Sequence, residues 1–257
     1  MHFPLYLHLG ALRIHPHWIF EALAYFVGFR IYLHLRHTRG DSVQEDVRWW
    51  VITAAALGAA AGSKLLSILE EPGFAAAHWR EPYLLLNGKT IVGGIIGGWI
   101  AVELCKRRLH EQQRTGDLFV LPMCIGMAIG RIGCFLTGPE DHTFGAASSL
   151  PWAMDLGDGV RRHPLPLYEI LFLLALAAVL WRVMQRPHVN GDIFKMFMCA
   201  YMAWRFATEF IKDRDPLFLQ ITAIQWACVG VLLFYTPDIW RWLRHAPAGK
   251  LAIETGD

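Results

Sequence analysis

The chain has 257 residues, of which 54% are hydrophobic, 13% aromatic and 18% charged. Soluble domains usually carry about 25% charged residues, so this composition favours an all-α protein embedded in a membrane. The formal net charge of +2 comes from scattered basic residues, which argues against a nucleic-acid partner. All five cysteines lie in apolar stretches and none forms a CxxC pair, so we expect neither a disulfide framework nor a metal site.

A bundle of about seven transmembrane helices follows from the apolar segments, since a spanning helix needs about 20 mostly apolar residues. The segments cover residues 18–36, 49–69, 91–105, 116–137, 166–186, 192–212 and 218–236. The third is the shortest and contains the run IVGGIIGGWIA. Because small residues let helices approach closely, we expect this helix at the bundle centre, against its neighbours. The alternative is a loosely packed apolar helix.

The loops predict the orientation of the chain. Cytoplasmic loops are enriched in Lys and Arg; thirteen basic residues fall on the side of the C-terminus and seven on the other. The N-terminus is therefore expected outside and the C-terminus in the cytoplasm. Residues 70–90 resemble an interfacial segment, as do His15 and His17 before the first helix. The polar stretch 138–165 is a candidate extracytoplasmic cap within a single domain, 1–257.

Ionisable residues also fall inside the predicted helices. They include Arg30, Lys64, Arg131, Arg205, Glu21, Glu103, Glu169 and Glu209. A charge near the bilayer centre costs roughly 2.5–3.5 kcal/mol, so such groups pair with one another or line a polar cavity. Both a set of structural ion pairs and a functional site are compatible with this pattern.

Arg131 is the strongest candidate for a functional role. It lies in GMAIGRIGCFLTG, where Gly126, Gly130, Gly133 and Gly138 are expected to leave space around the guanidinium. Arginine binds phosphate through two parallel hydrogen bonds, which lysine cannot do. The pattern therefore predicts a site for a phospholipid headgroup, with Arg205 as a second cation.

Three motifs, GRIGCFLTG, RHPLPLYE and YMAWRFATEF, resemble in order and spacing those of the prolipoprotein diacylglyceryl transferase family. AYFVGF, AAGSKLL, VGGIIGG and TAIQ are similar as well. The resemblance implies an enzyme of the bacterial cytoplasmic (inner) membrane. Such an enzyme moves a diacylglyceryl group from phosphatidylglycerol to the lipobox cysteine thiol of a preprolipoprotein and releases glycerol phosphate. We expect a monomer in the lipid bilayer, with no cofactor.

The resemblance also implies the site. It assigns Arg131 and Arg205 to the lipid phosphate, where fixed cations would stabilise the charge of the leaving group. Further substrate contacts are implied for residues that match the motifs. These are Lys64, Gly93, Gly94, Gly130, Gly133, Gly138, His163, Tyr168, Glu169, Tyr201 and Glu209.

The chain departs from the family pattern where the reaction handles a proton. Val92 stands where the family has a histidine, and Cys134 where it has an asparagine. Pro166 replaces a glutamine, Glu140 is displaced by one position, and Lys212 replaces an arginine. Two alternatives therefore stay open: the same lipid donor with a different acceptor, or a phospholipid-binding relative without activity.

Three residues are candidates for the missing base, because the acceptor thiol must become a thiolate before it attacks. His142 and Glu140 follow the signature at the outer mouth of the site, and imidazole transfers protons well near neutral pH. Glu21 is a carboxyl group in the apolar first helix. Alternatively, His142 is a solvated loop histidine, and Glu21 pairs with Lys64 or Arg205.

Overall fold

The computed structural model describes residues 3, 5–9, 12–40, 43–141, 143–212 and 218–245, and this part of the chain is mostly helical. Its α-helices are α1 (Pro16–Arg39), α2 (Glu45–Glu70), α3 (Pro72–Ala77), α4 (Pro82–Leu85), α5 (Ile91–Arg108), α6 (Asp117–Thr137), α7 (Leu165–Met184), α8 (Asp192–Glu209), α9 (Ala223–Phe234) and α10 (Thr236–His245). The short elements are the strands β1 (Leu7–Leu9), β2 (Leu12–Ile14), β3 (Met154–Asp155) and β4 (Arg161–Arg162), and the 3-10 helix η1 (Gly138–Asp141). The predicted all-α class is confirmed for these residues.

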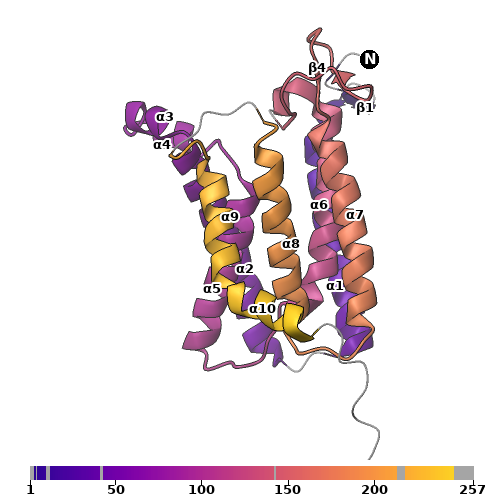
Figure 1. Ribbon diagram of the computed structural model, residues 1–257, viewed down its shortest axis with the longest axis vertical. Coiled ribbons are helices and arrows are strands. Elements are labelled where there is room, and N and C mark those ends of the chain that lie inside the picture. Colours follow the sequence, from indigo (N-terminus) through magenta and orange to yellow (C-terminus); the bar gives the residue numbers. More distant parts are fainter. Residues whose placement is uncertain are drawn as a thin grey trace, which may run out of the picture.

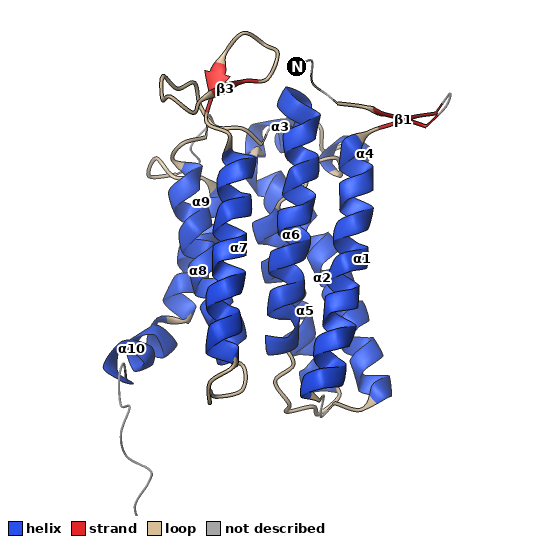
Figure 2. Ribbon diagram, turned by 90° about the vertical axis from the view of Figure 1, so that its right-hand side faces the viewer, coloured by secondary structure: helices blue, strands red, loops and turns tan. Residues whose placement is uncertain are grey.

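The long helices run side by side along the longest dimension of the molecule (Figure 1). The two views place α3, α4 and the β3–β4 hairpin at the end that carries the N-terminus, and α10 at the opposite end (Figures 1 and 2). Each predicted segment coincides with a helix, namely α1, α2, α5, α6, α7, α8 or α9. The boundaries differ most near the end of the chain, because α8 ends at Glu209 and α9 begins at Ala223.

Three helical stretches of the described chain are long and apolar enough to cross a membrane. They are Glu45–Glu70, Asp117–Asp141 and Leu165–Met184. Large apolar side chains also point outward from the bundle, since Leu57, Leu171 and Leu233 are 67–68% exposed. Water would disfavour such a surface, whereas lipid chains solvate it.

Glycines bring α2 and α5 into close contact. A Cβ atom on Gly62 would lie 2.3 Å from the carbonyl oxygen of Gly93, and one on Gly97 would lie 2.3 Å from that of Gly58. The predicted close packing of the glycine-rich helix is therefore confirmed. Its expected central position is wrong, because residues on the outer face of α5, such as Ile100, are exposed.

The pairing of α1 with α6 uses the glycines that flank Arg131 in the sequence. A Cβ on Gly126 would lie 3.3 Å from the carbonyl oxygen of Ala24, and one on Gly133 would lie 2.8 Å from the Cβ of Phe20. Gly130 alone among the four flanking glycines has no neighbour within 4 Å, when only described residues are considered. The expectation that all four clear space for a ligand is therefore wrong, because helix packing fills most of that space.

Gly138 ends α6. Its φ of 74° lies in the left-handed region, which glycine adopts without strain, and a Cβ there would meet the Phe3 side chain at 2.4 Å. The chain then turns through η1 into the segment predicted to form a cap.

The segment 138–165 is folded around a short antiparallel hairpin, β3–β4, in which Asp155 pairs with Arg161. The Arg161 guanidinium donates to the carbonyl oxygen of Ala153. Arg162 donates from two nitrogens to one oxygen of Asp158, and this hydrogen bonding holds the pKa of that carboxyl below its usual range. The hairpin covers the end of the bundle near the N-terminus (Figure 2).

Candidate active site

Two buried arginines, from two different helices, meet at the buried carboxylate of Glu169 on a third helix, α7. Its Oε2 atom lies 2.8 Å from Nε of Arg131 on α6 and 3.7 Å from Nη1 of Arg205 on α8. The exposed fractions of Arg131, Arg205 and Glu169 are 7%, 5% and 3%. Removing three charged groups from water is costly, and their mutual contact offsets much of that cost. The two guanidinium groups are therefore held side by side in the interior.

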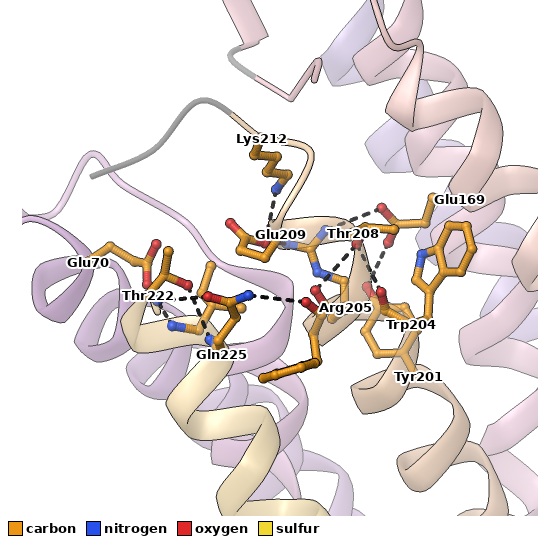
Figure 3. A network of polar contacts seen from close by, with 12 residues as sticks. Glu70, Glu169, Tyr201, Trp204, Arg205, Thr208, Glu209, Lys212, Thr222 and Gln225 are labelled. Carbon is orange, nitrogen blue, oxygen red and sulfur yellow. Dashed lines mark hydrogen bonds and ion pairs between the residues drawn. The ribbon is translucent and has the colours of Figure 1, made fainter. Parts of the chain in front are cut away.

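The site continues along one face of α8, because Tyr201, Arg205 and Glu209 are spaced by four residues. The Tyr201 hydroxyl donates to Oε1 of Glu169 at 2.7 Å. Nη2 of Arg205 donates to Oε2 of Glu209 at 2.8 Å, and Nζ of Lys212 lies 3.5 Å from the same oxygen (Figure 3). The helix thus supplies a phenol, a guanidinium and a carboxylate to one polar cluster.

Several buried N–H groups of this cluster have no hydrogen-bond partner in the described part of the chain. They are Nε of Arg131, Nε of Arg205 and Nε1 of Trp204. The Arg131 Nε atom is close to Glu169, but the contact lacks the angle of a hydrogen bond. An unpaired buried donor costs about 1–3 kcal/mol, so the cluster is suited to a ligand that brings acceptor oxygens.

The start of α9 fixes the position of α8 beside it. Thr222 and Gln225 form a reciprocal capping box, and Nε2 of Gln225 donates to the carbonyl oxygen of Phe206 at 3.2 Å. Glu70, at the end of α2, accepts a hydrogen bond from the backbone N–H of Ile224 at 2.6 Å (Figure 3). The TAIQ motif therefore connects α2, α8 and α9 next to the arginines.

A second polar cluster adjoins Arg131 on the other side. Nη1 of Arg131 lies 3.7 Å from the Sγ of Cys134, one turn further along α6. A ring nitrogen of His17, the Sγ of Cys134 and a carboxylate oxygen of Asp141 all lie within 4.8 Å of one another. Nδ1 of His17 and Oδ1 of Asp141 are 3.3 Å apart. This cluster joins α1, α6 and η1.

A pocket of about 310 Å³ opens beside the second cluster. Its lining residues come from the start of α1 and the end of α6 with η1: His15, His17, Trp18, Thr137, Glu140 and Asp141. The pocket therefore gives access from the exterior to the cluster next to Arg131.

A family model described as prolipoprotein diacylglyceryl transferase matches residues 4–239 of this chain. The chain belongs to the prolipoprotein diacylglyceryl transferase family. A phosphatidylglycerol–prolipoprotein diacylglyceryl transferase of Bordetella parapertussis is 32% identical over 247 residues, covering 90% of this chain and 91% of the relative. Proteins with the same name from Cupriavidus necator (31% over 267 residues, 96% and 95% covered) and Methylibium petroleiphilum (32% over 258 residues, 93% and 95% covered) are also similar.

The family's motif residues fall into separate groups in the structure. Arg131, Arg205, Glu169, Tyr201 and Glu209 come together in the first cluster. The motifs that carry them lie on different helices, so only the packing of α6, α7 and α8 joins them.

Other predicted site residues of the transferase family motifs lie apart from that cluster. Nδ1 of His163 is 3.3 Å from the Tyr168 hydroxyl, which accepts a hydrogen bond from Nε1 of Trp152 at 2.7 Å. This group connects α7 to the 138–165 segment. Lys64 donates hydrogen bonds to the carbonyl oxygens of Leu86 and Gly88. These bonds connect α2 to the segment after α4.

Gly93 and Gly94 face α2. A Cβ on Gly94 would lie 3.6 Å from the carbonyl oxygen of Ala59, in ordinary van der Waals contact, whereas one on Gly93 would clash with the backbone of Gly62. The structure thus gives both glycines a packing position, and their contact with substrate stays a prediction.

The structure places the three candidate bases differently. Glu21 does not pair with Lys64 or Arg205 in the described structure; its carboxylate lies 3.6 Å from Nε2 of His17 and 3.8 Å from Nζ of Lys89. Glu140 is exposed at the pocket. His142 lies outside the described residues.

The second cluster is the part of the site that sequence reasoning missed. His17 is not simply interfacial, because its ring lies against Asp141 and Cys134. His17 and Cys134 are far apart in the chain, so no local spacing could reveal their contact. The only signal was the unusual Cys134 in the family signature.

Proposed function

We propose that this chain transfers a diacylglyceryl group from phosphatidylglycerol to the cysteine thiol of a preprolipoprotein and releases glycerol phosphate. The observation that carries the proposal is the convergence of Arg131 and Arg205 on Glu169, with the buried Nε–H of Arg205 and Nε1–H of Trp204 left without a hydrogen-bond partner among the described residues. Membership of the transferase family supports it, since relatives along the whole chain carry this activity in their names.

The arginines act on the leaving group. In the reaction, the acceptor thiolate forms a C–S bond to the glyceryl carbon, and the C–O bond to the phosphate breaks. The electron pair of that bond stays on the phosphate oxygen. Charge therefore increases at the phosphate, and cations already fixed by Glu169 stabilise it without reorganising. The Nε–H of Arg205, which has no partner among the described residues, is a donor for a phosphate oxygen, and Arg131 supplies a second fixed positive charge beside it.

The acceptor thiol loses its proton to a base at the mouth of the site. Glu21, Glu140 and His142 are the candidates. Glu140 lines the pocket, Glu21 lies in α1 one turn after the pocket residue His17, and His142 directly follows the pocket residue Asp141 in the sequence. Val92 is buried at 1% exposure in α5 and has no titratable group. The proton therefore leaves by a different residue from the histidine that the family has at this position.

The membrane arrangement belongs to the same proposal. The seven helices α1, α2, α5, α6, α7, α8 and α9 cross the bacterial cytoplasmic membrane, with the N-terminus outside and the C-terminus in the cytoplasm. The chain is one domain and acts as a monomer, and the segment 138–165 is its extracytoplasmic cap. The exposed aromatic residues Trp79 and Tyr83 support an interfacial position for the 70–90 segment.

A two-substrate assay tests the proposal. Purified protein in detergent is incubated with phosphatidylglycerol labelled in its acyl chains and with a lipobox peptide. The expected products are a thioether-linked diacylglyceryl peptide and free glycerol phosphate in equal amounts. Glycerol phosphate without modified peptide would indicate another acceptor. Saturable lipid binding without either product would contradict the enzymatic proposal.

A further inference from the structure

We propose that His17, Cys134 and Asp141 form a binding site for a divalent metal ion of the zinc type. Imidazole, thiolate and carboxylate are the donors that Zn²⁺ prefers in proteins. The proposal departs from the expectation that the cysteines are only apolar packing residues. It concerns ion binding alone and does not depend on the transferase reaction.

The spacing of the donor atoms fits one shared ion. A tetrahedral ion with bonds of about 2.0–2.3 Å separates its ligand atoms by about 3.3–3.8 Å. Nδ1 of His17 and Oδ1 of Asp141 are 3.3 Å apart, and all three donor atoms lie within 4.8 Å of one another.

The orientation of His17 also points to a missing partner. Its Nδ1 atom is buried and makes no hydrogen bond in the described part of the chain, although Asp141 is close. A buried ring nitrogen near a carboxylate would normally be aligned with it to form a hydrogen bond. An ion between the imidazole nitrogen and the carboxylate oxygen would satisfy both groups at once.

Each of the three donor side chains also has a second neighbouring group that would help to orient it toward an ion. Oε2 of Glu21 lies 3.6 Å from Nε2 of His17, the far side of the ring. The Thr143 hydroxyl donates to Oδ2 of Asp141 at 2.8 Å, which leaves Oδ1 toward His17. Nη1 of Arg131 donates to the Cys134 sulfur at 3.7 Å. Partners of this kind orient metal ligands and strengthen binding.

The site has an accessible side. His17 and Asp141 line the pocket of about 310 Å³, together with the exposed Glu140. Three protein ligands and one position open to solvent are the arrangement of zinc sites that exchange their fourth ligand. A water molecule entering from the pocket can fill this position, so an ion has both an entry path and a complete coordination shell.

Zinc content and cobalt spectroscopy test the site. The full chain, prepared without a polyhistidine segment, is stripped with a chelator, dialysed against Zn²⁺ and analysed by mass spectrometry; about one ion per chain is expected. Replacement of Zn²⁺ by Co²⁺ should produce a near-ultraviolet thiolate-to-cobalt band. Cys134→Ala should abolish this band, whereas Cys124→Ala, at a buried cysteine of the same helix, should retain it.

Two further variants keep the test decisive if Cys134→Ala does not fold. Asp141→Asn should lose zinc, and Glu21→Gln should weaken zinc binding by about 10–100-fold through the outer partner of His17. A wild-type chain that folds and takes up no zinc would overturn the proposal and leave His17 and Asp141 as an ion pair. Equal zinc binding by Cys134→Ala and Cys124→Ala would overturn it as well.

Discussion

The Oε2 atom of Glu169 lies 2.8 Å from the Nε atom of Arg131, and this ion pair joins α7 to α6 inside the bundle. The same oxygen lies 3.7 Å from Arg205 on α8. The contact therefore has a structural role, because it compensates buried charges on three helices. In the proposed function the same contact would hold two guanidinium groups ready for the lipid phosphate, so an ion pair that stabilises the fold and a phosphate site are not exclusive interpretations.

Glu169→Gln should strongly destabilise the protein. The amide can still accept a hydrogen bond from Tyr201, but the two arginines would lose the carboxylate between them. Removing one partner of a buried ion pair costs about 3–5 kcal/mol. A denaturant titration in detergent should measure this decrease in the free energy of unfolding. Glu81→Gln, at an exposed position, should change the same quantity by less than about 0.5 kcal/mol.

Arg131→Lys and Arg205→Lys should each reduce turnover by about 10²–10³-fold while leaving the protein folded. Lysine keeps the charge next to Glu169 but lacks the second nitrogen needed to bind a phosphate through two bonds. The rate of glycerol phosphate release measures the effect. Arg30→Lys is the matched control, because Arg30 is exposed on α1 and should retain full activity. Wild-type rates in Arg131→Lys would remove that residue from the phosphate role.

Gly62→Ala should destabilise the α2–α5 pair by about 1–3 kcal/mol or more, because the added Cβ would lie 2.3 Å from the carbonyl oxygen of Gly93. Gly230→Ala provides the contrast, since a Cβ there has no described neighbour within 4 Å. Alanine at that helical position should be neutral or stabilising by about 0.5–1 kcal/mol. Melting temperatures of the two variants compare them directly, and equal values would argue against tight glycine packing.

Glu21→Gln, Glu140→Gln and His142→Gln should be assayed side by side to find the base. Loss of a general base typically slows a reaction by about 10²–10⁴-fold, so at least one variant should lose most of its activity with the lipobox peptide. Raising the pH should partly restore that variant, because hydroxide then generates more of the acceptor thiolate. If all three variants retain wild-type rates, the proton leaves by another group.

The sequence alone was sufficient to predict the positions of the long helices and the family of the protein. Apolar segments of spanning length are local features, and all of the predicted segments are helical in the structure. The glycine run of α5 correctly predicted close packing, since only residues without a Cβ allow two backbones to approach so closely. Arg131 and Arg205 could be selected because charges are rare in such helices and must have partners.

Only the tertiary structure decided which groups meet. The shared contact of Arg131 and Arg205 with Glu169 depends on how α6, α7 and α8 pack, and no spacing along the chain encodes it. The same holds for His17, which meets Cys134 because α1 packs against α6. Periodicity in a sequence reports which face of a helix is apolar, but the choice of neighbouring helix results from side-chain packing across the whole bundle.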